Sequence, residues 1–308
     1  MLAATMRSLV VRNVHRGTSQ AFHNVVSAPR GGSGLQGELH DAGFLPGLGD
    51  GRPMTPLRRI LVWISGASAG LGAALAATIP FESAELIDIS RRGGTPGTHH
   101  VAVDLADPES WPVVEKDFRQ RIEAGDPELV VFIHNAGTLT PLGSADHVDT
   151  EQYTRNVLLN SAAAQVLGQS FLSAVSGRDC EQHLIMVSSG AAKRPHEGES
   201  SYCAGKAAID QWVRTVGLEQ QRRSPGCRVI SVSPGSVDTA MQAELRAASS
   251  DEVPVSGRFR EMQALGNLAK PETVARTIWS LLDRDLPSGT VLHVRDVTDD
   301  ESHPVIDQ

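Results

Sequence analysis

Tyr202 and Lys206 are the two residues whose types and spacing most clearly indicate chemistry. They stand four positions apart within residues 200–206, so in a helix the phenol and the ammonium share one face. A free tyrosine keeps its proton up to a pKa of about 10, and a neighbouring cation lowers that pKa toward the range of efficient proton transfer. The pair therefore predicts a general acid, although the same spacing also arises by chance on solvated helix faces.

A glycine-rich turn far upstream gives this pair a context. The apolar run at residues 60–64 has the length of a strand, residues 65–72 read Ser-Gly-Ala-Ser-Ala-Gly-Leu-Gly, and the alanine-rich residues 73–79 follow. Glycines permit a sharp turn and the close approach of a pyrophosphate, and the helix N-terminus beyond them offers unpaired N–H groups to an anion. This order of strand, turn and helix predicts a dinucleotide-binding unit.

Four motifs, in a fixed order over residues 57–296, resemble those of the short-chain dehydrogenase/reductase family. Residues 65–72 are similar to its TGxxxGxG turn, with serine in first place, and residues 134–137 to its NNAG motif, with histidine in first place. Ser189 precedes Tyr202 by thirteen residues, the family's usual interval, and Pro234-Gly235 follows the sixth predicted strand. Residues 202–208 and 234–242 are similar to the sepiapterin reductase and benzil reductase branch.

The resemblance implies hydride transfer between a nicotinamide and a substrate carbonyl, for which the protein supplies a proton and holds the developing oxyanion. Tyr202 would donate the proton, while Lys206 would lower the pKa of Tyr202 and hold the nicotinamide ribose. Ser189 would donate a hydrogen bond to the substrate oxygen, and Ser188 is the alternative to it.

Asn160 completes the expected catalytic group. By resemblance it would hold a water that links Lys206 to solvent. Asn156, one helical turn earlier, is the competing assignment, and an asparagine inside a helix can also simply bond to its own backbone or face solvent.

The end of the second predicted strand indicates which dinucleotide binds. An acidic residue there would accept hydrogen bonds from the ribose of NAD, whereas a small polar residue followed by arginine suits a 2′-phosphate. Ser90 occupies this position and Arg91 and Arg92 follow, which predicts NADPH. The arginines could also belong to a solvated loop, and Asp88, two residues earlier on the same strand, could be mistaken for a ribose ligand.

The remaining expected cofactor contacts follow from the family motifs. Asp104 and Leu105, after the third strand, would flank the adenine by resemblance. The full expected set is Gly66, Ser68, Gly70, Leu71, Gly72, Ser90, Arg91, Asp104, Leu105, Asn135, Ala136, Gly137, Tyr202, Lys206, Pro234, Gly235, Val237 and Thr239.

Alternating strand and helix patterns predict an α/β fold, a Rossmann-type doubly wound parallel sheet forming a single domain of three α/β/α layers. The order 3-2-1-4-5-6 is expected, and the family implies a seventh strand. A long helix should cover residues 150–174, and Asp107 should cap another that begins at Pro108. The expected strands are residues 60–64, 84–89, 101–103, 129–133, 184–187, 229–232 and 289–294.

This domain should occupy residues 57–296, between an N-terminal extension at residues 1–56 and an acidic tail at residues 297–308. The first thirty residues contain four arginines and no acid, a composition compatible with a transit peptide. A disordered or added leader, or a start codon placed too early with Met54 opening the natural domain, is the favoured alternative.

Composition narrows the possible partners. The formal charge of −8 argues against binding of a nucleic-acid backbone, and no apolar run is long enough for a membrane span. The three cysteines, Cys180, Cys203 and Cys227, are scattered, which indicates a reducing, cytoplasmic environment and no metal site. Relatives often associate through their fourth and fifth helices, so a homo-oligomer (dimer or tetramer) is expected.

The substrate is the least determined feature. Residues 236–268, with Met241, Phe259, Met262 and Leu265, should form a lid over the nicotinamide, although these side chains could equally serve helix packing. Sepiapterin reductases carry an aspartate on the last strand where this sequence has His293, which favours an NADPH-dependent reductase of ketones or diketones. An NADP-dependent alcohol dehydrogenase and a non-catalytic NADPH sensor are the alternatives.

Overall fold

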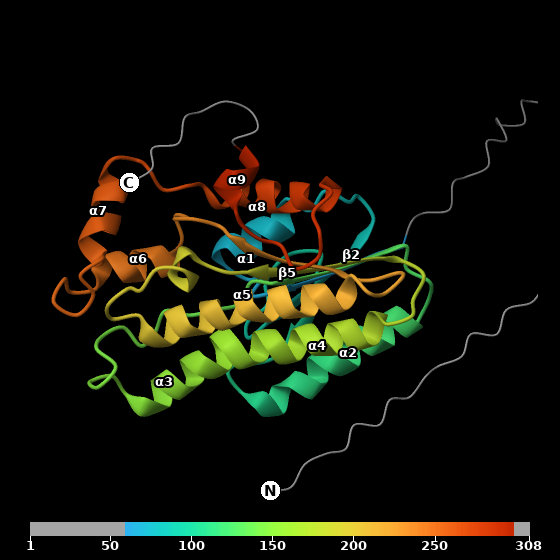
Figure 1. Cartoon of the computed structure of the whole chain (residues 1–308), viewed down its shortest axis with the longest axis horizontal. Helices are drawn as coiled ribbons and strands as arrows, with labels where there is room; N and C mark the ends of the chain where they lie inside the picture. Colours follow the sequence, from blue (N-terminus) through green and yellow to red (C-terminus); the bar gives the residue numbers. More distant parts are fainter. Residues whose placement is uncertain (1–58, 299–308) are drawn as a thin grey trace, which may run out of the picture. The chain divides into compact units, whose positions relative to one another are not determined.

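The computed structural model describes residues 59–298, and within them a parallel sheet of seven strands forms the centre (Figure 1). The strand order is β3-β2-β1-β4-β5-β6-β7, so the predicted doubly wound arrangement and its seventh strand are confirmed. Each strand pairs in parallel with its neighbour. The strands are β1 (Ile60–Ser65), β2 (Ala84–Ser90), β3 (His99–Ala102), β4 (Leu129–His134), β5 (Glu181–Val187), β6 (Arg228–Ser233) and β7 (Val291–His293).

Helices cover both faces of the sheet, because the crossovers between parallel strands place them there (Figure 1). Helices α1 and α8 lie on one face, and α2, α4 and α5 lie on the other. The helices are α1 (Gly70–Ala77), α2 (Trp111–Glu123), α3 (Thr150–Val157), α4 (Ala163–Val175), α5 (Ser200–Gln220), α6 (Ala240–Ala247), α7 (Ser256–Ala264), α8 (Pro271–Ser280) and α9 (Val294–Thr298).

Strand β1 shows why the apolar runs of this sequence form a central sheet. All six of its residues are buried, and alternate side chains enter opposite hydrophobic cores. Val62 and Ile64 pack on the side of α1 and α8, whereas Trp63 packs edge-to-face on Phe118 of α2, with 5.2 Å between ring centroids. The glycine turn that follows β1 is therefore fixed between two packed layers.

The structure departs most from the predicted elements in three places. The long helix at residues 150–174 is interrupted by a π-helical turn, Leu158–Ala162, which separates α3 from α4. Asp107 does act as a cap, but it precedes a 3-10 turn, Pro108–Ser110, that leads into α2. The last strand is only three residues long, because the chain turns into α9 at Val294.

Residues 236–268, the predicted lid, contain two short helices. Thr239 caps α6 by accepting a hydrogen bond from the backbone N–H of Gln242, and α7 follows. Both helices lie at one end of the sheet (Figure 1).

The predicted N-terminal extension lies outside the described residues, as does the acidic tail beyond residue 298. The predicted domain end at residue 296 falls inside α9. Among residues 59–298, none of the helices is long and apolar enough to cross a membrane.

Candidate active site

The carboxyl ends of the central strands border a cavity of about 1080 Å³. Gly66 after β1, Asn135 after β4, Ser188 after β5 and Pro234 after β6 all line it. The winding of the sheet reverses between β1 and β4, and ligands of open α/β sheets bind at such switch points. The cavity therefore lies where this fold normally binds a ligand.

All of the predicted site residues except Gly72 and Asn160 line this cavity. Gly72 instead allows the turn to pack closely: a Cβ there would lie 2.0 Å from the carbonyl oxygen of Gly66 and 2.6 Å from Nδ2 of Asn135. Gly66 and Gly70 have φ angles of +71° and +53°, in the left-handed region that favours glycine. The three glycines thus let the chain bend from β1 into α1.

The glycine turn is tied to the segment after β4 by Ser65. Its hydroxyl accepts hydrogen bonds from the backbone N–H of Asn135, at 2.9 Å, and of Ala136, at 3.0 Å. At the start of α1, Ala69 provides no side-chain cap and the first turn contains no acid. The backbone N–H groups at this helix start are therefore suited to an anionic ligand.

The end of β2 presents arginines to the cavity. Ser90 accepts a hydrogen bond from the backbone N–H of Gly93 at 3.1 Å, which closes the turn that carries Arg91 and Arg92, and both arginines line the cavity. Asp88, by contrast, is fully buried and does not border it.

Asp104 and Arg155 both line the cavity and form an ion pair, with 2.5 Å between Oδ2 and Nη2. Burial alone would raise the pKa of Asp104, but the backbone N–H of Ala106 and the Arg155 guanidinium hold it below its ordinary value. Arg91 acts in the same direction. Asp104 therefore remains ionised.

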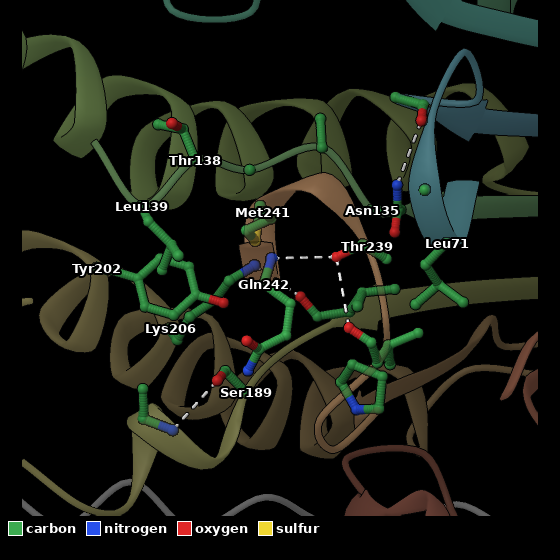
Figure 2. A pocket seen from close by; sticks show the side chains of 18 of the residues that line it. Leu71, Asn135, Thr138, Leu139, Ser189, Tyr202, Lys206, Thr239, Met241 and Gln242 are labelled. Atoms are coloured by element: carbon green, nitrogen blue, oxygen red, sulfur yellow. Dashed lines mark hydrogen bonds between the residues drawn. The ribbon is translucent and has the colours of Figure 1, made fainter. Parts of the chain in front are cut away.

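Helix α5 places Tyr202 and Lys206 on one buried face, with Nζ of Lys206 5.7 Å from the Tyr202 ring centroid. Figure 2 shows the Tyr202 hydroxyl directed into the cavity beside Lys206 and Ser189. Burial raises the pKa of Tyr202 to about 12; the Ser189 hydroxyl opposes this rise and the Glu199 carboxylate adds to it.

The expectation that Lys206 lowers the pKa of Tyr202 is wrong for this structure, because desolvation of the phenol dominates. Burial also lowers the pKa of Lys206 to about 8. Its Nζ donates a hydrogen bond of 2.8 Å to the carbonyl oxygen of Val187.

Ser188 and Ser189 both line the cavity, so their positions alone do not decide which of them would donate to the substrate oxygen. The Ser189 hydroxyl accepts a hydrogen bond from the backbone N–H of Ala191 at 3.2 Å and influences the pKa of Tyr202. The Ser188 hydroxyl is buried without a hydrogen-bond partner among the described residues.

Asn160 lies behind the cavity wall, in the π-helical turn, whereas its competitor Asn156 borders the cavity. Asn160 accepts a hydrogen bond from the backbone N–H of Thr138 at 3.0 Å and donates to the carbonyl oxygen of Thr138 and to Oδ1 of Asn156, each at 2.8 Å. A Cβ on Gly137 would contact both Oδ1 of Asn160 and Nζ of Lys206. The geometry therefore shows Asn160 fixing the segment after β4, close to Lys206.

An apolar cluster adjoins the far end of the cavity. Leu139, Tyr202, Leu245 and Val253 form a buried cluster there, with partly buried side chains from α6 and α7 packed against it. Of the four side chains predicted for the lid, Met241, Phe259 and Met262 line the cavity. Leu265 does not; it is 66% exposed, because it follows the last turn of α7.

Some of the polar residues at this end carry no predicted role. Glu199 and His196 border the cavity between Ser189 and Tyr202, outside every motif. The sequence indicates Glu199 as a site residue only by its spacing, since it stands three residues before Tyr202, about one helical turn away. His293, noted for the last strand, also lines the cavity, and burial lowers its pKa.

Comparison with known proteins agrees with this geometry. Residues 61–250 match the family model described as short chain dehydrogenase. A benzil reductase ((S)-benzoin forming) of Bacillus subtilis strain 168 is 30% identical over 236 residues, covering 76% of this chain and 97% of the relative. A sepiapterin reductase of Rattus norvegicus is 32% identical over 161 residues, covering 51% of this chain and 60% of that protein.

Among solved structures, a short chain dehydrogenase/reductase from Saccharomyces cerevisiae superposes with a TM-score of 0.66 at 18% identity, covering 78% of this chain and 98% of that one. The chain belongs to the short-chain dehydrogenase/reductase family and is an oxidoreductase. Members of this family use NAD or NADP.

Proposed function

We propose that this protein is an NADPH-dependent carbonyl reductase that acts on ketones or diketones. The observation that carries the proposal is the single cavity into which the glycine turn, Arg91, Ser189, Tyr202 and Lys206 all converge. This chain matches two benzil reductases over nearly their whole length, which supports a diketone as substrate.

The residues present fit a dinucleotide. The sharp turn through Gly66 and Gly70 and the uncapped start of α1 suit its pyrophosphate, and the cavity is large enough for a dinucleotide with a small substrate. Ser90 leaves room for a 2′-phosphate that Arg91 would pair with, and the acid nearest on the strand, Asp88, is buried away from the cavity. When bound, NADPH supplies the hydride.

The chain itself would supply the proton and hold the substrate oxygen. Tyr202 donates the proton from its hydroxyl, and Ser189 donates a hydrogen bond to the same oxygen. Lys206 would hold the nicotinamide ribose, and Asn160 would position the segment of Thr138 beside it. The apolar cluster around Leu139, at the far end, would receive the rest of the substrate and exclude water.

We also propose that the chain works as a cytoplasmic homo-oligomer through α4 and α5. Supporting this, a groove between these helices is bordered by Gln165, Trp212 and Val216, and Val166 on α4 is 38% exposed.

The test is the loss of NADPH absorbance with a panel of diketones, quinones, aldehydes and sepiapterin, with NADH run in parallel. We expect turnover of a ketone or diketone that is faster with NADPH than with NADH. NADPH binding without turnover of any compound would instead support a cofactor sensor, and preferential turnover with NADH would reject the assigned cofactor.

A further inference from the structure

Glu199 is a buried carboxylate at the substrate end of the cavity that the proposed mechanism does not use. It precedes the first residue of α5, borders the cavity and is only 2% exposed. Its Oε1 is buried without a hydrogen-bond partner among the described residues. Leaving a buried polar oxygen in this state is costly, so a partner for it is to be expected.

The other carboxylates that border the cavity already have such partners. Asp104 accepts hydrogen bonds from the backbone N–H of Ala106 and from Arg155. Asp296 accepts a hydrogen bond from the backbone N–H of His293 at 2.8 Å. Oε1 of Glu199 lies 3.5 Å from Nδ1 of His196, and among residues 59–298 neither of these two atoms completes a hydrogen bond.

The surroundings of Glu199 explain what kind of partner is missing. Tyr202, one turn along α5, belongs to the apolar cluster that also contains Leu139 and Val253. Glu199 raises the pKa of Tyr202, so its charge acts directly on the phenol. A carboxylate in such a wall accepts a hydrogen bond from an O–H or N–H group and disfavours carboxylates and aliphatic substituents.

We infer that Glu199, with His196 beside it, recognises a hydroxyl or amino substituent on the carbonyl substrate. The inference rests on the proposed function and narrows its substrate class to ketones or diketones that carry such a donor near the reacting carbonyl. A site that offers a buried acceptor discriminates strongly against an analogue without the donor, because the acceptor is then left unpaired.

The test compares acetophenone with its ring-hydroxylated and ring-aminated derivatives as substrates for NADPH-dependent reduction. Glu199→Leu and the isosteric Glu199→Gln are measured beside the wild type, and Glu197→Gln, at an exposed position two residues away, is the matched control. The readout is the ratio of kcat/KM for each substituted ketone to that for acetophenone. Because both ketones use the same Tyr202, any change in its pKa largely cancels in this ratio.

The wild type and Glu197→Gln should prefer a hydroxylated or aminated derivative by about tenfold or more, and Glu199→Leu should reduce this ratio to about one. Glu199→Gln, which keeps an acceptor without the charge, should give an intermediate ratio. A preference that persists in Glu199→Leu, or is absent from the wild type while acetophenone is reduced, overturns the inference and leaves the proposed function standing.

If the wild type reduces none of these ketones, a binding measurement still tests recognition by Glu199. Saturation-transfer NMR then compares 4-ethylphenol with ethylbenzene, in the presence of NADPH. Stronger binding of the phenol that disappears in Glu199→Leu supports the recognition while the proposed function fails. Equal binding of the two compounds rejects the recognition as well.

Discussion

At the scale of single residues, burial governs the ionisation of Tyr202 and Lys206. It raises the pKa of Tyr202 to about 12 and lowers the pKa of Lys206 to about 8. The phenol therefore keeps its proton at neutral pH, as a proton donor to a reduced carbonyl must. Sequence spacing correctly places the two groups on one helix face, but it carries no measure of desolvation, which decides the direction of the shift.

Replacing Tyr202 by phenylalanine should lower kcat by about 100-fold or more, because the variant loses the proton donor. Affinity for NADPH, measured by fluorescence titration, should change little since the ring remains in place. Tyr153, the other tyrosine of the chain, lies on α3 with its hydroxyl 3.2 Å from that of Ser200, and Tyr153→Phe is the matched control. Wild-type kcat in Tyr202→Phe would reject the assigned acid.

Arg91→Ala should weaken NADPH binding by about tenfold or more and leave NADH binding nearly unchanged, because only NADPH carries the 2′-phosphate. Both dissociation constants can be measured on the same preparation by titration of nicotinamide fluorescence. Arg119→Ala, in an exposed i,i+4 pair with Glu115 on α2, is the control for a general loss of positive charge. Equal weakening of both cofactors would show that Arg91 does not bind the phosphate.

At the scale of elements, packing separates what the sequence predicts from what it does not. The apolar run of β1 and the glycines after it predict a strand, a turn and a helix because each local preference agrees with the fold. The π-helical turn at Leu158–Ala162 has no such local signal. It places Asn160 against the backbone of Thr138, a contact between distant segments that periodicity cannot reveal.

The residues of the candidate site also fall into two groups: those that local sequence predicts and those whose places depend on packing. Motif residues such as Gly66 and Ser189 could be identified from local sequence, since family spacing fixes their places. Glu199 has only its spacing from Tyr202 as a sequence signal and His196 has none, because the burial of both depends on how α5 packs on the loops around it. Helices α6 and α7 could likewise not be predicted from the sequence, since residues 236–268 have a weak apolar pattern.

Gly72→Ala should destabilise the junction of β1 and α1. Its Cβ would lie 2.0 Å from the carbonyl oxygen of Gly66, so the backbone of the turn must shift, at a cost of about 1–3 kcal/mol or more in the free energy of unfolding. NADPH binding should weaken as well, since the turn borders the cavity. Denaturant unfolding measures the first effect.

Gly190→Ala is the control for this change, since no atom would lie within 4 Å of the added Cβ and its φ is not positive. It should unfold close to the wild type. If Gly72→Ala were as stable as Gly190→Ala, the close packing of the glycine turn would be contradicted.

At the scale of the whole molecule, polar groups buried in the sheet couple its stability to pH. His134, the last residue of β4, is completely buried and lies 3.2 Å from the Ser65 hydroxyl through Nδ1. Burial, with a smaller contribution from the Lys206 cation, lowers the pKa of His134 to about 3. An unfolded histidine titrates near about 6.5, so the unfolded chain binds one more proton than the native one between these pH values.

The free energy of unfolding should therefore fall as the pH drops below about 6.5, by on the order of 2 kcal/mol between about pH 7 and pH 5 from His134 alone. His134→Asn, which keeps a polar side chain beside Ser65 but cannot take up this proton, should remove that part of the slope. His183, whose pKa burial also lowers, contributes in the same direction and remains in both proteins. Urea unfolding at a series of pH values gives both curves.

His147→Asn is the matched control, because the His147 side chain is 82% exposed and its replacement should leave the wild-type pH dependence intact. The difference between the curves of the wild type and His134→Asn should grow steadily from about pH 6.5 downward, since the wild type alone pays for keeping this imidazole neutral. Parallel curves over that range would mean that His134 takes up a proton in the folded sheet, which would require a partner for its buried Nε2 that residues 59–298 do not provide.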